Sequence, residues 1–305
     1  MISIVVPVYN SYEFLHLLLE SIDLEKCKYN WELEVIMVDD GSKDKSFEKI
    51  VELAQKYLYI KGVKLSRNFG HQLAVRTGFD YCTGDYIAVI DDDLQDPPFL
   101  LNSFINYLKD GYDVVYGVRK KRKEGLLKKM SYHVFYRLLD FMSHTKIPLD
   151  SGDFCVMKKV VLENMLKFPE KNPYLRGIRA WVGFNQIGVE YERNSRVAGD
   201  SGYSISKLFQ IAFNGIFSFS NLPLKLITMS GTFGLISAIL YVIYIFYKFY
   251  FLGIEVKGFV SLAVLISFFS SLILICLGIV GEYIARIYEE VRNRPHSVIC
   301  QTVNI

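Results

Sequence analysis

Two long apolar stretches near the end of the chain constrain its fold more than any other feature. Residues 226–251 and 259–284 are each longer than the roughly 20 residues that a helix needs to span a bilayer, and the charged residues Lys248 and Glu282 lie near their ends. A buried hairpin of core helices is the alternative, but no part of the chain remains to cover it. We therefore expect a two-helix membrane hairpin over residues 225–287.

Basic residues lie at both outer ends of this hairpin, with Lys225 at its start and Arg292 and Arg294 after it. The linker 252–258 between the two helices carries only one acidic and one basic residue. Because Lys and Arg are retained on the cytoplasmic side of membranes, we expect the N-terminal domain and both chain ends to be cytoplasmic.

The remaining chain divides into three parts. Residues 1–203 alternate charged and apolar stretches, which is typical of a folded domain. Residues 204–224 are apolar on one side, with Lys207 and Gln210 on the other, as in a helix that lies in the membrane surface. A core helix remains the alternative there. Residues 288–305 are expected to form a cytoplasmic tail.

The composition argues against several classes of function. A net charge of +3 provides no bulk basic field for nucleic acid, so we expect no such partner. Five scattered cysteines without a C-x-x-C pair are typical of reduced thiols in the cytoplasm. One basic run, residues 119–123, is either a solvated loop or a site for a phosphate-rich ligand or anionic lipid headgroups.

Short apolar runs in the N-terminal domain alternate with segments expected to be helical. The runs predict strands at residues 2–8, 33–38, 63–65 and 86–90. The expected helices lie near residues 14–22, 46–57 and 73–81. This alternation predicts an α/β fold with a mostly parallel sheet. Polar clusters follow every predicted strand, and ligands of such sheets bind at the carboxyl ends of the strands.

Asp91, Asp92 and Asp93 follow the last of these strands. Adjacent residues on an extended chain point to opposite sides, so Asp91 and Asp93 share a side and Asp92 points away. Clustered carboxylates repel one another unless a cation neutralises them, and their oxygen atoms suit Mg²⁺ or Mn²⁺. We expect such a metal to bridge the phosphates of a nucleotide-sugar. An acidic helix-capping turn is the alternative, and Asp96, which precedes two prolines, is expected to be an N-cap.

A nucleoside pocket is expected beside the aspartates. Asp39 is suited to accept a hydrogen bond from a base N–H, while Tyr9 offers a ring for stacking. Residues 66–72 supply hydrogen-bond donors at a helix start, which suits a phosphate or a ribose. Within them, His71 is expected to be a structural hydrogen-bonding residue rather than a catalyst.

Four motifs together resemble glycosyltransferase family 2. They are Val6-Pro7-Val8-Tyr9-Asn10, Val38-Asp39-Asp40-Gly41-Ser42, Ser66-Arg67-Asn68-Phe69-Gly70 and Asp91-Asp92-Asp93-Leu94-Gln95-Asp96-Pro97-Pro98. The sequence is most similar to the polyprenyl-phosphate glycosyltransferase branch, which includes dolichyl-phosphate mannose synthase and the bactoprenol glucosyltransferases. The similarity covers nearly the whole chain, and the order and spacing of the motifs are specific.

The resemblance implies a GT-A catalytic domain over residues 1–203 and a divalent cation, Mg²⁺ or Mn²⁺. It implies inverting transfer of a single sugar from a nucleotide-sugar to a polyprenyl phosphate. A UDP-sugar is the expected donor, with a guanine nucleotide as the alternative, and a bacterial inner membrane is the expected location. Glycines in the apolar stretches suit close helix packing and leave a homo-oligomer open.

The resemblance also implies roles for individual residues. The metal would be held by Asp91, Asp93 and Gln95, and Asp93 is thereby also a catalytic residue. The nucleotide site would contain Pro7, Tyr9, Asn10, Asp39, Asp40, Ser66, Asn68, Gly70 and, near the diphosphate, Arg119.

Asp153 matches the proposed catalytic base of the family. The acceptor, however, is a phosphate monoester with a second pKa of about 6, so it is already largely dianionic at neutral pH. Little proton abstraction is then required. We interpret Asp153 as a residue that orients the acceptor or an adjacent cation, with general base as the alternative.

Arg193 and Arg196 are the expected ligands of the acceptor phosphate, because a guanidinium binds phosphate bidentately. Two further candidates are Arg176 and Arg179. Related enzymes often carry a lysine where this chain has Gly202, and Lys207 is expected to supply that charge.

Two other functions remain open. A processive polysaccharide synthase of the same superfamily typically has a Q-x-x-R-W-type motif and more membrane spans, whereas Trp181 lacks that context here. A membrane-anchored protein that binds nucleotide-sugars without turnover is the second alternative. The complete acidic cluster argues against it.

Overall fold

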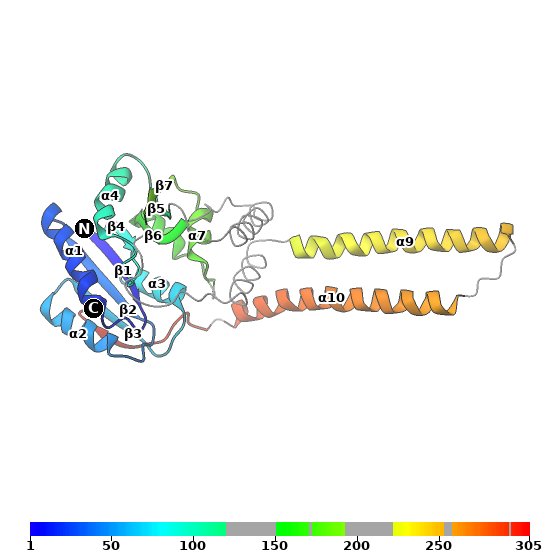
Figure 1. Ribbon diagram of the computed structural model, residues 1–305, viewed down its shortest axis with the longest axis horizontal. Coiled ribbons are helices and arrows are strands. Elements are labelled where there is room, and N and C mark those ends of the chain that lie inside the picture. The colour runs from blue at the N-terminus through cyan, green and yellow to red at the C-terminus, as the bar shows by residue number, and fades with distance from the viewer. Residues whose placement is uncertain (120–150, 171–172, 193–221, 253–257, 293) are drawn as a thin grey trace. The chain divides into compact units, whose positions relative to one another are not determined.

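The structure of the protein is a computed structural model, which describes residues 1–119, 151–170, 173–192, 222–252, 258–292 and 294–305 (Figure 1). The chain divides into two compact units. The first holds residues 1–136, 145–202 and 293–305, and the second holds residues 137–144 and 203–292. Three predicted acceptor ligands, Arg193, Arg196 and Lys207, lie outside the described residues, as does nearly all of the expected surface helix over 204–224.

An eight-stranded mixed sheet forms the centre of the first unit, with the strand order β7-β5-β6-β4-β1-β2-β3-β8. The neighbours β1 and β2, β1 and β4, β2 and β3, and β5 and β7 run parallel. In contrast, β6 is antiparallel to β4 and β5, and β8 is antiparallel to β3. The strands are β1 (Ile2–Val8), β2 (Leu33–Asp39), β3 (Ile60–Leu65), β4 (Tyr86–Val89), β5 (Val114–Arg119), β6 (Ser151–Lys158), β7 (Gln186–Tyr191) and β8 (Ile299–Val303).

Helices cover both faces of this sheet, which explains why every residue of β1 and β2 is buried. On one face lie α1 (Leu15–Tyr29), α2 (Ser46–Lys56) and α4 (Leu101–Lys109), the last preceded by the short 3₁₀ helix η1 (Pro98–Leu100). On the other face lie α3 (His71–Phe79), α6 (Lys159–Met165) and α7 (Leu175–Trp181).

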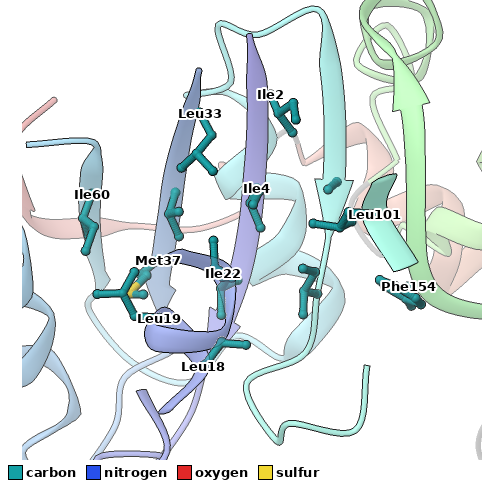
Figure 2. Packing of buried hydrophobic residues seen from close by; sticks show 14 of the residues in the cluster. Ile2, Ile4, Leu18, Leu19, Ile22, Leu33, Met37, Ile60, Leu101 and Phe154 are labelled. Carbon is teal, nitrogen blue, oxygen red and sulfur yellow. The ribbon is translucent and has the colours of Figure 1, made fainter. Parts of the chain in front are cut away.

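Apolar side chains join each helical layer to the sheet. Figure 2 shows Leu18 and Ile22 of α1 in the same apolar cluster as Ile4 of β1 and Met37 of β2. The next residue of β1, Val5, faces the opposite layer, because successive side chains of a strand alternate between faces. Fully burying a side chain of this size contributes roughly 1.5–3 kcal/mol to folding.

The predicted α/β fold with a mostly parallel sheet is confirmed. The four predicted strands correspond to β1–β4 and the three predicted helices to α1–α3, with ends that differ by a few residues. The later strands have no counterpart among the sequence-based predictions, because their pairing depends on partners far away in the chain. In particular, β6 inserts antiparallel between β4 and β5.

The C-terminal segment contributes an edge strand to the same sheet. Within the tail expected over residues 288–305, β8 pairs with β3 and places Lys64 opposite Gln301. The carbonyl of Val298 accepts a hydrogen bond of 2.8 Å from the amide of Ser66, directly after β3. The chain end is therefore bound beside one of the predicted nucleotide-binding segments.

The second unit contains two long helices, α9 (Leu222–Leu252) and α10 (Phe259–Val291). Within them, Ile227–Lys248 and Phe268–Ala285 are long and apolar enough to cross a membrane, and neither segment is buried inside the protein. These helices coincide with the two apolar stretches identified in the sequence.

Candidate active site

The carboxyl ends of β1, β2, β3 and β4 meet at one edge of the sheet because these strands run in the same direction. The antiparallel strand β6 begins at this edge, and its register pairs Cys155 with Val89 of β4. Continuing this register by two residues brings Asp153 level with Asp91. Topology therefore unites a carboxylate of the late strand β6 with the aspartate run after β4.

His71, the first residue of α3, lies between these two carboxylates. Its Nε2 is 2.9 Å from Oδ1 of Asp91, and its Nδ1 is 3.8 Å from Oδ2 of Asp153. Burial would lower the pKa of His71, but the hydrogen bond and the negative charge of Asp91 raise it to about 9. The resulting imidazolium balances part of the negative charge at this edge. This contact agrees with the expectation that His71 is a structural hydrogen-bonding residue.

Asp153 is engaged through both of its oxygens. Arg176 of α7 donates from Nε to Oδ1 at 2.8 Å and from Nη2 to Oδ2 at 2.7 Å. The side-chain amide of Gln72 donates to Oδ2 at 3.2 Å. Burial would raise the pKa of Asp153, but the guanidinium of Arg176 holds that pKa well below its usual range. A carboxylate in this state is a poor proton acceptor, which favours the orienting role over that of a general base.

The aspartates after β4 point to different partners. Asp92 accepts hydrogen bonds from the amide of Tyr9, at 3.1 Å, and from the hydroxyl of Ser11, so it ties the end of β4 to the loop after β1. Burial raises the pKa of Asp92 to about 6. Asp93 accepts from the amide of Gln95 at 3.2 Å in a tight turn. β4 ends at Val89 and residues 92 and 93 form a turn, so the expected alternation along an extended chain does not apply here. Asp92 and Asp91 differ instead in their hydrogen-bond partners.

A divalent cation fits the donor set of Asp91 and Asp93. The described residues include no group of three or more His, Cys, Asp or Glu side chains that would enclose a metal unaided. Mg²⁺ typically binds through one or two carboxylates together with substrate phosphates, and it does not need such a cage. Gln95, which is buried, carries a third oxygen of suitable chemistry. The assignment of these three ligands stays a prediction.

Asp39, at the end of β2, has an unused acceptor. Its side chain is completely buried, and its Oδ1 accepts from the amide of Ser42 at 3.2 Å. Its Oδ2 is buried without a hydrogen-bond partner among the described residues. Burial raises the pKa of this carboxyl. In the adjacent strand, Val8 pairs with Asp39, and the next residue, Tyr9, is 44% exposed. An orphaned acceptor beside an exposed ring suits a nucleobase.

Two other predicted nucleotide-binding residues hold loops in place. Both oxygens of Asp40 accept hydrogen bonds from loop amides, at 2.7 Å from Phe69 and 2.9 Å from Gly70. Asn10 donates its amide to the hydroxyl of Ser42 at 2.9 Å and accepts from the amide of Lys43 at 2.8 Å. These contacts give Asp40 and Asn10 a positioning role, whether or not they also touch the nucleotide.

The loop after β2 approaches the loop after β3 closely enough to require glycine. A Cβ atom on Gly41, whose φ is +67°, would lie 2.4 Å from the carbonyl carbon of Arg67. Ser66 and Asn68 in that second loop are exposed, as the prediction of a ligand contact requires. Two further predicted nucleotide-binding residues lie in strands of the sheet. Pro7 lies in β1, and Arg119 is the last residue of β5.

The N-cap predicted at Asp96 is wrong. The following 3₁₀ helix begins at Pro98 with Pro97 as its N-cap. Asp96 is buried instead and accepts a hydrogen bond of 2.7 Å from the hydroxyl of Tyr191 in β7. A tertiary partner far along the chain thus takes the carboxylate. No local sequence signal marks this pairing, or that of Asp153 with Gln72 and Arg176.

Solved structures place this architecture among known folds. Glucosyl-3-phosphoglycerate synthase from Mycobacterium tuberculosis, in complex with Mn²⁺, uridine-diphosphate-glucose and glycerol 3-phosphate, superposes with a TM-score of 0.50 at 16% identity, covering 71% of this chain and 78% of that chain. The likeness shows a shared GT-A fold. The fold therefore places the protein in the GT-A class.

The sequence model of Glycosyl transferase family 2 matches residues 3–166. The uncharacterized glycosyltransferase YkcC of Bacillus subtilis is 42% identical over 99% of this chain and 94% of its own length. The SfII prophage-derived bactoprenol glucosyl transferase of Shigella flexneri is 38% identical over 98% of this chain and 97% of its own length. The chain belongs to glycosyl transferase family 2.

Proposed function

We propose that this protein transfers a single sugar from a nucleotide-sugar, a UDP-sugar, to a polyprenyl phosphate at the cytoplasmic face of a bacterial inner membrane. The observation that carries the proposal is the 38% identity to a bactoprenol glucosyl transferase over 98% of the chain. The two apolar helices support it, because helices long enough to cross a membrane would hold the enzyme where a lipid acceptor lies.

The connectivity of the sheet supports an even number of membrane crossings. The strand β7 precedes α9, and β8 follows α10, yet both belong to the same sheet. A chain that leaves this sheet, crosses a membrane and returns to the sheet must cross an even number of times. Two helices satisfy this condition, and the basic residues at the outer ends of the hairpin support a cytoplasmic domain.

The donor site in this proposal lies at the ends of β1 and β2. Asp39 Oδ2 accepts the N–H of the base, and the ring of Tyr9 stacks on it. Asp91, Asp93 and Gln95 would hold the metal, which when bound would supply positive charge that stabilises the leaving diphosphate. His71 keeps Asp91 oriented through their 2.9 Å hydrogen bond.

The reaction forms a bond between an oxygen of the acceptor phosphate and the anomeric carbon of the sugar. It breaks the bond between that carbon and the diphosphate, and the electron pair leaves with the nucleoside diphosphate. Attack from the opposite side inverts the anomeric configuration. The acceptor phosphate is largely dianionic at neutral pH, so no protein group has to remove a proton.

A transfer assay tests the proposal. Membranes that contain the full chain are supplied with radiolabelled nucleotide-sugars and a polyprenyl phosphate, and label is counted in the organic extract. We expect one nucleotide-sugar to give a lipid that carries a single sugar. Asp93→Asn membranes are the matched control. Extractable label that is equal in both membranes, or absent from both, would refute the proposal.

The same assay separates the two alternatives. A polymer in place of the single-sugar lipid would identify a processive polysaccharide synthase. Donor binding that is unchanged in Asp93→Asn, with no transfer by the wild type, would identify a nucleotide-sugar-binding protein without turnover.

Excess chelator should abolish transfer, and added Mg²⁺ or Mn²⁺ should restore it. Full activity in chelator would contradict the metal assignment.

A further inference from the structure

We propose that Arg176 binds the acceptor phosphate, and that Gln72 and Asp153 are positioning residues that present its guanidinium. This inference rests on the proposed function and names the residue that receives the acceptor. It differs from the sequence-based expectation, which gave that role to Arg193 and Arg196 and ranked Arg176 below them.

The guanidinium of Arg176 is fixed along one edge and accessible along the other. Asp153 occupies Nε and one N–H of Nη2 through its bidentate contact. A guanidinium carries five N–H donors in a rigid plane, so the Nη1 donors point away from Asp153. Among the described residues, no other hydrogen bond engages this group. The side chain of Arg176 is 31% exposed, so an anion can approach the unused edge.

Gln72 fixes the position of α7 relative to Asp153. Its Nε2 donates to Asp153 Oδ2 at 3.2 Å, and its Oε1 accepts from the amide of Leu175 at 3.1 Å. Leu175 directly precedes Arg176 in the chain. One amide side chain on α3 therefore links β6 to the first residue of α7, and Arg176 is oriented before any ligand binds.

The neighbouring contacts place Arg176 beside the predicted metal site. His71 is in contact with Asp91 at 2.9 Å and lies 3.8 Å from Asp153, the partner of Arg176. The attacking phosphate has to approach the sugar close to the diphosphate that the metal site holds. Asp91 and Asp153 would repel a dianion at this point, so its binding requires a permanent positive charge that faces the acceptor.

The second arginine of α7 is unsuitable for this role. Arg179 is only 3% exposed, and its guanidinium lies 5.1 Å from the centre of the Tyr116 ring. Its backbone carbonyl accepts a hydrogen bond of 2.6 Å from Gln186. Arg179 therefore packs α7 onto the sheet, and Arg176 is the arginine of this helix that a ligand can reach.

The test compares Arg176→Gln with Arg76→Gln in the detergent-solubilised full chain. Arg76 of α3 is paired with Asp80, the C-cap residue of that helix, at 2.6 Å, and among the described residues no hydrogen bond or ion pair joins it to Asp153 or α7. For Arg176→Gln, we expect the KM for undecaprenyl phosphate to rise about 10-fold to 100-fold, the loss typical of a charge-assisted contact. The KM for the nucleotide-sugar should change by less than about threefold in both variants.

A second pair of variants distinguishes positioning from general damage to the fold. Gln72→Leu should raise the acceptor KM by about 3-fold to 10-fold alone, and by little when Arg176 is already Gln, because both changes act through one interaction. Arg176→Lys keeps the charge and the packing, so its acceptor KM should lie between those of the wild type and of Arg176→Gln. This variant also tests the inference if Arg176→Gln does not fold.

An acceptor KM that stays at the wild-type value in the folded Arg176 variants would overturn the inference while leaving the proposed function intact. Equal losses for donor and acceptor would also overturn it. If the wild type transferred no sugar to undecaprenyl phosphate, the proposed function itself would fail, and the inference with it.

Discussion

Asp153 must keep its negative charge if it orients the acceptor, whereas it must gain a proton if it acts as a general base. The ion pair with Arg176 holds the pKa of Asp153 well below its usual range, so its charge persists throughout the pH range of enzyme assays. A depressed pKa means that the ion pair stabilises the fold above the ordinary carboxyl range and is lost only in strong acid. The acidic limb of the pH–rate profile should therefore not belong to Asp153.

We predict that kcat/KM for the acceptor falls below a pH of about 6, where the phosphate becomes a monoanion. Asp153→Asn should lower kcat/KM about 10-fold to 100-fold, because Arg176 loses its bidentate partner, and should retain the acidic limb. The measurement is kcat/KM for the acceptor between about pH 5 and 8. Loss of the acidic limb in this variant would instead identify Asp153 as a general base.

The orphaned oxygen of Asp39 makes a separate prediction about the donor. Asp39→Asn should raise the KM for the nucleotide-sugar about 10-fold, since an amide at this position cannot replace both carboxylate oxygens as acceptors. The acceptor KM should not change. Asp23→Asn is the matched control, because Asp23 accepts a hydrogen bond from Tyr59 at 2.8 Å on α1. An unchanged donor KM in Asp39→Asn would place the base elsewhere.

Sequence reasoning reached these two aspartates by different routes. Asp39 follows an apolar strand, and strand ends in parallel sheets are ligand sites, so the position was predictable from local pattern. Asp153 was singled out by the family resemblance alone. Its partners Gln72 and Arg176 lie 81 and 23 residues away, and pairings of that kind depend on tertiary contacts.

At the scale of single elements, the end of β4 distributes its three carboxylates between different neighbours. Asp91 contacts a residue of α3, Asp92 accepts a hydrogen bond from the loop after β1, and Asp93 accepts one from within its own loop. This division arises in the turn that follows β4, where residues 92 and 93 leave the direction of the strand. Asp92 therefore has a structural role between the two proposed metal ligands, Asp91 and Asp93.

We predict that Asp93→Asn lowers kcat at least about 100-fold, because it removes one of two carboxylates from the metal site. Asp92→Asn should instead destabilise the fold by at most about 1 kcal/mol, since both hydrogen bonds end on Oδ2 and the amide oxygen of an asparagine can accept them there. It should keep the wild-type response to added Mn²⁺. Thermal unfolding and metal titration of activity measure both effects. A matching loss of activity in the two variants would argue against this division.

Helices and strands were predictable where nearby residues in the sequence determine them, and not where they depend on distant partners. The strands β1 and β2 are fully buried and mostly apolar, and the helix α1 between them carries an apolar face, so these elements were predictable from sequence pattern. The insertion of β6 between β4 and β5 did not, because antiparallel pairing with a distant strand leaves no local mark. For the same reason, the contact of Asp96 with Tyr191 was missed.

At the scale of the whole molecule, the chain end is a structural part of the catalytic domain. Beyond the β3–β8 ladder, Ser297 shares a hydrogen bond of 2.7 Å with Thr77 of α3, and Asn304 donates to the carbonyls of Ala54 and Ile60. Residues 297–305 therefore support α3, which carries His71 and Gln72. They also support the loop that begins at Ser66.

We predict that ending the chain before Ser297 leaves membrane insertion unchanged but weakens the active site. The four hydrogen bonds outside the ladder, at about 0.5–1.5 kcal/mol each, imply a loss of about 2–6 kcal/mol in unfolding free energy. The donor KM should rise about 3-fold to 10-fold, because Ser66 loses its contact with Val298.

Ser297→Ala, which removes one of the four hydrogen bonds, is the graded control. Thermal unfolding in detergent and donor KM provide the measurements. A truncated enzyme with wild-type values for both would show that β8 only covers the edge of the sheet.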